Sequence, residues 1–119
     1  MSGNRLTELP APLFGLTDLL TLNASNNRIR AVSSRIAELK NLCWLYLENN
    51  ALTSLPDEIG ALRRLIWLSL RRNKLSDLAG PLTGSRVKDL CVAGNPLTTN
   101  AVARSNLKKA LPKTKIFWS

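Results

Sequence analysis

Few side chains in this sequence could carry covalent, acid–base or metal chemistry. The candidates are Cys43, Cys91 and the adjacent carboxylates Asp57 and Glu58, and the chain has no histidine. Histidine is the commonest general base and the commonest neutral metal ligand, so both roles lose their usual residue. The cysteines lack an activating partner, the carboxylates fit a solvated surface, and no glycine-rich phosphate loop occurs. The sequence therefore predicts a protein that is not an enzyme and that uses no cofactor and no metal.

Side chains suited to binding are better represented. Tryptophan, tyrosine and arginine are the residue types most often found at energetic hot spots of interfaces, and they gather in the middle of this chain. The predicted partner-binding residues are Trp44, Tyr46, Trp67, Arg71, Arg72 and Lys74. In the alternative interpretation, the indole rings only shield the backbone beneath them and stack with arginine side chains. The choice depends on the elements that carry these residues.

A repeated pattern sets the spacing of these residues. The stretch 42–52 reads LCWLYLENNAL, and the stretches 19–29, 65–75 and 87–97 share its frame, LxxLxLxxNxL. The asparagines of the frame are Asn4, Asn27, Asn50, Asn73 and Asn95, at intervals of 23, 23, 23 and 22 residues. A fixed period of roughly 20 to 29 residues with this frame is typical of a solenoid.

The pattern resembles that of leucine-rich repeat proteins over residues 1 to about 97. The return segments LPAPLFGL, VSSRIAEL and LPDEIGAL resemble the 23-residue LPxxIxxL class of intracellular scaffold and signalling proteins and of bacterial effectors. The resemblance implies an α/β fold, a right-handed leucine-rich repeat solenoid with a short parallel sheet on its concave face, where the family binds its ligands. We expect a single domain over residues 1–119, with a partial repeat at 1–18, repeats at 19–41, 42–64, 65–86 and 87–97, and a C-terminal helical cap at 98–119.

Alternation within the frame predicts which side chains are buried. Leu45 and Leu47 alternate with Trp44, Tyr46 and Glu48, and a period of two is typical of a strand with one buried face. The same parity in the other repeats predicts four short parallel strands about 4.8 Å apart. The outward side of these strands would bring the two tryptophans together. The frame asparagines follow each strand, where their amides could bond the turning backbone as a structural ladder.

The segments between the strands should differ from one another. We expect a helical turn on the convex side in the first three, with proline in the first turn, but an irregular fourth segment at 76–86, which contains Gly80, Pro81 and Gly84. Residues 98–111 should form a helix capped by Thr99 or Asn100 and ended by Pro112. This helix should cover the last coil, and we expect the natural protein to end with it.

The first repeat is incomplete, because only residues 1–3 precede Asn4 to supply its strand. An uncapped coil exposes its core and a strand edge. We expect this N-terminal edge to self-associate or to be covered by a partner, or the chain to be a piece of a longer array. The residues leave these alternatives open.

The excess of positive charge lies in the second half of the chain. The net charge is +9 in total, with −1 over residues 1–59 and +10 over residues 60–119. Such a surface attracts acidic proteins and nucleic acids alike. The predicted anion-binding residues of the cap are Arg104, Lys108, Lys109, Lys113 and Lys115.

Two functions follow from these surfaces. The first is a non-catalytic interaction module that binds a protein segment, with an acidic partner expected, on the concave strand face. The alternative is a basic subunit of a ribonucleoprotein or other large assembly, which contacts nucleic acid or an acidic partner through residues 60–119. A basic surface that only keeps the protein in solution is a further interpretation.

The cysteines and the hydropathy pattern bear on location. Cys43 and Cys91 would lie two coils apart, about 10 Å by the strand spacing, whereas a disulfide needs Cα atoms within roughly 7 Å. No apolar run approaches the roughly 18 residues of a membrane span, and the start has no apolar signal segment. We therefore expect free thiols and an intracellular protein in the cytoplasm, with an organelle or the nucleus as alternatives.

Overall fold

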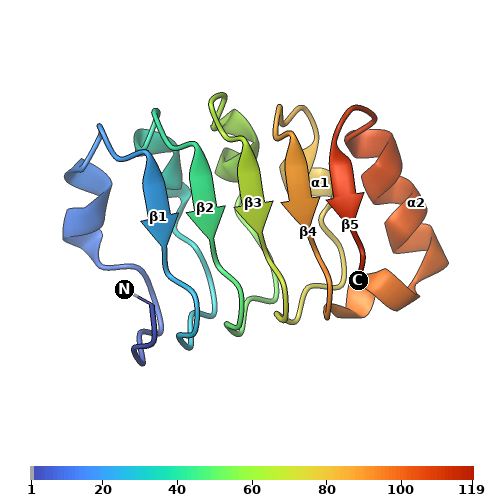
Figure 1. Ribbon diagram of the computed structural model, residues 1–119, viewed down its shortest axis with the longest axis horizontal. Helices are drawn as coiled ribbons and strands as arrows, with labels where there is room; N and C mark the ends of the chain where they lie inside the picture. The colour runs from blue at the N-terminus through green and yellow to red at the C-terminus, as the bar shows by residue number, and fades with distance from the viewer. Residues whose placement is uncertain (1) are drawn as a thin grey trace.

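A five-stranded parallel sheet runs the length of the molecule in the computed structural model, which describes residues 2–119. Its strands pair in chain order: β1 (Thr21–Asn23), β2 (Trp44–Tyr46), β3 (Trp67–Ser69), β4 (Asp89–Cys91) and β5 (Lys115–Phe117). The strands lie side by side on one face, and the segments that connect them return on the other (Figure 1). Each coil thus adds one strand to its predecessor, which confirms the predicted solenoid.

The central residue of each repeat strand points into the core. Leu22, Leu45, Leu68 and Leu90 are buried and stand in register across the sheet. Their neighbours point outward, so the alternation within the LxL part of the frame places one side of every strand against the leucine core. Burial of this one face fixes the register, because a slip by one residue would expose every leucine.

The first three return segments form short 3-10 helices, as the spacing of their apolar residues predicts. They are η1 (Ala11–Gly15), η2 (Ser34–Glu38) and η3 (Asp57–Ala61), and Ile36 and Ile59 of η2 and η3 are fully buried. Pro12 lies in the first turn of η1, as predicted, whereas Pro56 precedes η3 as its N-cap residue, so the predicted place of proline was wrong for η3.

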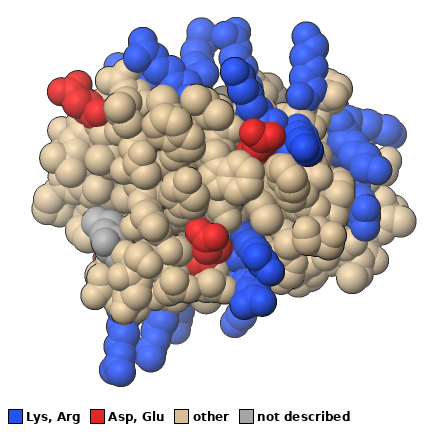
Figure 2. All heavy atoms as spheres, in the orientation of Figure 1, with Lys and Arg blue, Asp and Glu red and all other residues tan. Residues whose placement is uncertain are grey.

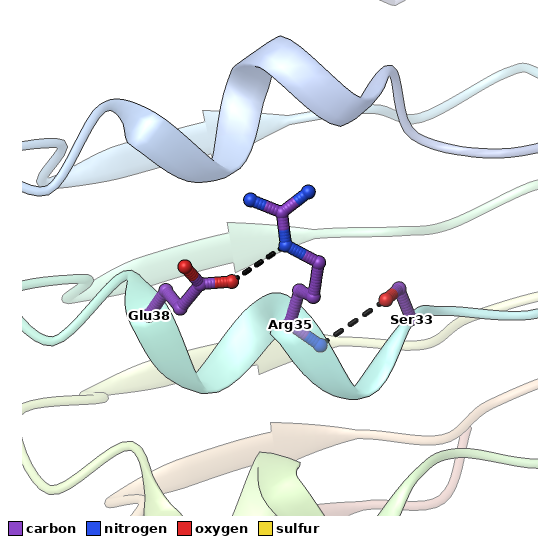
Figure 3. Close-up of polar contacts among 3 residues, drawn as sticks. All are labelled: Ser33, Arg35 and Glu38. Atoms are coloured by element: carbon purple, nitrogen blue, oxygen red, sulfur yellow. Dashed lines mark hydrogen bonds and ion pairs between the residues drawn. The ribbon is translucent and has the colours of Figure 1, made fainter.

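Side-chain contacts on the solvent side support η2. The Ser33 hydroxyl accepts a hydrogen bond from the Arg35 backbone N–H, and the Arg35 side chain forms an ion pair with Glu38 at 2.7 Å (Figure 3). Both charged side chains are about half exposed, so the ion pair contributes little beyond about 0.5 kcal/mol. The stability of the return segment therefore comes from the buried isoleucine.

The fourth return segment is helical, and the prediction of an irregular segment was wrong. α1 (Ala79–Leu82) is one turn of α-helix, in which the Asp77 carboxylate accepts a hydrogen bond from the Ala79 N–H. Leu78 and Leu82 are both buried; their spacing of four brings them to one face of a helical turn. Pro81 falls in the first turn, where its missing N–H has no partner to lose. Burial of the two leucines thus outweighs the turn-forming composition.

The C-terminal region closes the core and also extends the sheet. After η4 (Pro96–Thr99), α2 (Ala101–Ala110) is capped by Asn100, whose side chain accepts hydrogen bonds from the N–H groups of Val102 and Ala103. Leu107 of α2 is fully buried. The chain then forms β5, paired in parallel with β4. The prediction of four strands was therefore wrong by one.

The start of the chain lies against the first coil without adding a strand. The Gly3 N–H donates to the Ser25 carbonyl at 3.1 Å, whereas Met1 lies outside the described residues. β1 is the first strand of the sheet, and Leu16 and Leu20 beside it are 54% and 52% exposed. Self-association through this edge stays a prediction. Within residues 2–119, no helix has the length and apolar character to cross a membrane.

Frame asparagines join each coil to its predecessor. The Asn73 Nδ2 donates to the Leu70 carbonyl of its own coil at 3.0 Å and to the Leu47 carbonyl of the coil before at 2.9 Å, and its Oδ1 accepts from the Leu52 N–H at 3.0 Å. Asn50 and Asn95 make the equivalent contacts. One side chain thus satisfies backbone groups of two coils.

Asn27 starts this series. Its Nδ2 donates to the Ala24 carbonyl at 3.0 Å, and its Oδ1 accepts from the Leu6 N–H at 3.1 Å. Asn4, the first frame asparagine, is exposed, whereas Asn27 is buried. The buried series therefore begins with the first complete repeat.

Replacing a buried or half-buried frame asparagine should lower the free energy of unfolding. In Asn73→Leu, three backbone groups lose their partner, at about 1 to 3 kcal/mol for each one left buried and unpaired. Chemical denaturation should show this loss for Asn73→Leu and Asn50→Leu. Asn106→Leu, at an exposed position of α2, is the control and should stay within about 0.5 kcal/mol of wild type. Unchanged stability in both ladder variants would refute the role of the amides.

Candidate functional site

The outward side chains of the five strands form two columns, which together we call the strand face. The first residues of the strands form one column: Thr21, Trp44, Trp67, Asp89 and Lys115. The third residues form the other: Asn23, Tyr46, Ser69, Cys91 and Phe117. Parallel pairing brings together residues 22 or 23 positions apart in the repeats. The strand face faces the viewer in Figure 1.

Aromatic side chains occupy the middle and one end of this face. Trp44 is 37% exposed, while Tyr46 and Trp67 are half-buried. Phe117 lies 5.8 Å from Trp67 between ring centroids, at an interplanar angle of 56°, which is a favourable tilted geometry. Sequence reasoning missed Phe117, because β5 lacks the repeat frame. The alternation of Lys115, Ile116 and Phe117 was the available signal.

Packing holds Trp67 more firmly than Trp44. The Trp67 Nε1–H is buried and has no hydrogen-bond partner within residues 2–119. Its indole thus lies in an apolar setting against Phe117, whereas the Trp44 ring is the large exposed apolar side chain of the face. An incoming ligand would therefore meet Trp44 first.

The predicted cations lie beside the aromatic residues instead of among them. Arg71, Arg72 and Lys74 are all exposed and belong to the turn that follows β3. Glu48, in the equivalent turn of the preceding coil, is half-buried. The structure thus separates the predicted partner-binding residues into three aromatic side chains on the strand face and three cations in the turn after β3.

One residue in every turn has left-handed backbone. These residues precede the frame asparagines: Gly3, Asn26, Asn49, Arg72 and Gly94, with φ from 56° to 78°. Glycine and asparagine tolerate this region, whereas arginine does so only at a cost of roughly 1 to 2 kcal/mol. Costly backbone conformations are frequent at functional sites, and Arg72 is the residue here that departs from the pattern.

Close contact between coils explains one of these glycines. A Cβ added to Gly94 would lie 3.0 Å from Cγ and 3.4 Å from Cα of Arg72. Gly94 therefore lets the Arg72 turn approach the next coil. The left-handed backbone and this neighbour thus fix the backbone and the base of the Arg72 side chain, which is exposed.

The structure places the cap cations in different settings. Arg104 lies over the Trp118 ring at 4.5 Å and donates from Nη1 to the Thr98 carbonyl at 3.0 Å, and Lys108 lies 5.9 Å from the same ring. Lys115 lies 5.1 Å over Phe117 and belongs to the strand face. Lys109 and Lys113 are exposed. Cation–π contacts thus engage three of the five predicted residues.

Candidates for covalent or metal chemistry stay apart. Cys43 and Cys91 are free thiols, as predicted. Asp57 and Glu58 form the first turn of η3, where negative charge favours the helix N-terminus. Residues 2–119 contain no group of three or more histidine, cysteine or acidic side chains that could hold a metal ion. The described residues that could carry such chemistry therefore do not meet at one place.

Comparisons with known proteins agree with this architecture. The family model described as "Leucine rich repeat" matches residues 25–75. A solved leucine-rich repeat protein of Leptospira interrogans is 36% identical over 99% of this chain, with a TM-score of 0.88. The BIR3–SERK2 complex of Arabidopsis thaliana includes a chain 32% identical over 80% of this one, with a TM-score of 0.63. An internalin of Listeria monocytogenes is 23% identical over 99%, with a TM-score of 0.76, and shows the fold alone.

These structures are longer than the present chain. It spans 30% of the Leptospira protein, 33% of the internalin and 52% of the matched chain in the Arabidopsis complex. A search of curated proteins gave no match.

Replacing Arg72 should reveal the cost of its backbone conformation. Arg72→Asn should raise the free energy of unfolding by about 1 kcal/mol, because asparagine tolerates left-handed backbone. Asn49 already donates to Asn26 at 2.8 Å in the two preceding turns, so a third asparagine could continue that series. Denaturant unfolding measures the change, with Arg71→Asn as a neighbouring exposed control. Equal effects of the two substitutions would show that charge, and not backbone, sets the stability.

Proposed function

Because this chain belongs to the leucine-rich repeat family, we propose that it is a non-catalytic protein-interaction module whose strand face binds a protein segment. The family is in general an interaction fold, and a function has to be argued from a site. The observation that carries the proposal is the exposed Trp44 on a face that also presents Tyr46, Trp67 and Phe117. Such aromatic residues supply large contact area at interfaces.

The residues around the aromatic group support an acidic partner. Arg71, Arg72 and Lys74 are exposed in the turn after β3, and Lys115 stands at the end of the strand face. Two acidic residues lie near these cations, and both are half-buried: Glu48 in the turn after β2 and Asp89 at the first position of β4. The excess of basic over acidic side chains here favours a peptide segment with an apolar side chain that contacts Trp44 and carboxylates that contact the turn after β3.

The width of the sheet limits what can bind. Five strands at about 4.8 Å span roughly 19 Å, whereas a standard protein interface covers about 800 Å² on each partner. The strand face therefore suits a short peptide segment better than a large folded surface. The Arabidopsis relative was solved within a BIR3–SERK2 complex.

The free thiols support a reducing location. Cys91 lies on the strand face and Cys43 at the start of β2, and neither forms a disulfide. Free half-exposed thiols fit an intracellular protein in the cytoplasm, and this location is part of the proposal.

Removal of the Trp44 ring tests the proposed function. A random peptide library displayed on phage should yield ligands of the wild-type protein that are rich in acidic and apolar residues. Trp44→Ala should weaken the selected peptides by about 2 kcal/mol or more, or about thirtyfold in Kd, because the ring is a central contact. Isothermal titration calorimetry with synthetic peptides gives the Kd.

Val102→Ala is the matched control, since Val102 is 69% exposed on α2, away from the strand face. It should leave Kd unchanged. Peptides that bind Trp44→Ala as tightly as wild type would place the binding surface elsewhere. Trp67→Ala is a weaker test, because loss of the contact with Phe117 would also lower stability.

A further inference from the structure

A second surface lies where the chain enters the strands. Six lysine and arginine residues lie in the segments that lead into the N-terminal ends of β2 to β5. We call this group the basic edge. Its residues are Lys40, Arg63, Arg64, Arg86, Lys88 and Lys113. All six are exposed. Because the strands are parallel, these loops lie along the same edge of the sheet (Figure 1). Figure 2 shows lysine and arginine side chains projecting along this upper border.

The basic edge has little neutralising charge from the protein itself. The salt bridge found among residues 2–119 joins Arg35 to Glu38, so none of the six cations belongs to an ion pair there. Asp18 occupies the equivalent loop before β1, and the half-buried Asp89 begins β4. The remaining positive charge is available to an anionic partner.

Two open hollows accompany the cations. One, of about 550 Å³, is lined by Lys40, Arg63 and Arg64 between the second and third coils. The other, of about 460 Å³, is lined by residues that include Arg86, Lys88 and Lys113. The edge therefore alternates raised cations with recesses.

A hydrogen bond between coils positions one of the guanidinium groups. Arg64 Nη1 donates to the Asn41 side-chain oxygen at 2.9 Å, and Asn41 Nδ2 donates to the Thr17 carbonyl at 3.0 Å. These contacts link three successive coils at the edge. Arg64 is thus held in place before any partner arrives, which lowers the entropy lost on binding.

We propose that the basic edge binds the phosphate backbone of a nucleic-acid duplex. Half of its cations are lysines, which are depleted in protein–protein interfaces, whereas interfaces with nucleic acid are far more positively charged. A single strand would need a row of aromatic rings to stack its bases. The rings next to the basic edge are Trp44, which is 37% exposed, and Trp67, which packs against Phe117, so one exposed ring is available there. A duplex therefore fits the edge better than an acidic protein or a single strand does.

The spacing of the cations suits such a ligand. From β2 to β5 the edge spans three strand intervals, or about 14 Å, along which a duplex presents a phosphate about every 1.7 Å when both strands are counted. About eight phosphates fall within this length, so several cations can contact phosphates at the same time. Phosphate contacts carry no sequence information, so binding is independent of base sequence. The site is separate from the strand face and goes beyond the proposed function.

Salt dependence tests this proposal with the full chain. Fluorescence anisotropy should detect binding of a labelled 20-base-pair duplex of random sequence, in RNA and DNA form, between 50 and 200 mM salt. If all six cations meet phosphates, the slope of log affinity against log salt is about −5, and affinity falls roughly a thousandfold over this range. A preference for the RNA or the DNA duplex identifies the source of the phosphates, and either supports the proposal.

Two triple variants of equal charge locate the site. Lys40→Gln with Arg63→Gln and Lys88→Gln should make the slope shallower by about 3, because three phosphate contacts are lost. Arg5→Gln with Arg28→Gln and Arg30→Gln removes three exposed arginines of the N-terminal coils and should change the slope by less than about 1. Circular dichroism checks that both fold. Lys113→Gln, expected to change the slope by about 1, replaces the edge variant if that variant unfolds.

Several results would overturn the proposal. An equal change of the salt-dependence slope in the two triple variants would mean that duplex binding depends only on the net charge of the protein. Polyglutamate or a single-stranded 20-mer binding as tightly as the duplex would assign the edge to an acidic protein or a single strand. No binding at 50 mM salt would mean that the edge is not a nucleic-acid site.

Discussion

The asparagine that follows each repeat strand is the constraint on which the rest of this structure depends. Its amide donates to carbonyls of its own coil and the coil before, and its oxygen accepts an N–H from that earlier coil. Asn50, Asn73 and Asn95 share this arrangement, and Asn27 bonds its own coil and the Leu6 N–H of the coil before. Because the same side chain satisfies two coils, neighbouring turns must superpose, and the strands that precede them must align in register.

Variation between coils is therefore confined to the return segments. The 65–86 repeat is one residue shorter than the others, yet Asn95 still bonds the Leu70 carbonyl at 2.8 Å. The shorter segment forms α1 in place of a 3-10 helix. A Cβ on Gly60 would lie 2.9 Å from the Pro81 carbonyl oxygen, so glycine permits η3 to approach α1 closely. The ladder keeps its geometry while the opposite side adapts.

The same superposition turns a repeating sequence into distinct surfaces. Residues at one position of the frame become a column, so a few substitutions give each surface its own chemistry: aromatic residues on the strand face, cations in the loops that enter the strands, and Arg72 in a turn otherwise formed by glycine and asparagine. Only outward positions are free to vary in this way, because the inward positions are fixed by the core and the ladder. Aromatic and basic residues can therefore occupy separate faces of a small protein.

The sequence by itself determined the solenoid, the parity of its strands, the register of Trp44 with Trp67 and the free cysteines, because each of these follows from a local period or a spacing. The tertiary structure decided what lies outside the period. β5 forms because β4 offers it an open edge, and Phe117 thereby reaches Trp67. α1 forms because Leu78 and Leu82 meet a core that the other coils have built. Arg104 and Lys108 contact Trp118, and the basic edge arises from loops more than twenty residues apart, since side-by-side position depends on the stacking of coils and not on neighbours in the chain.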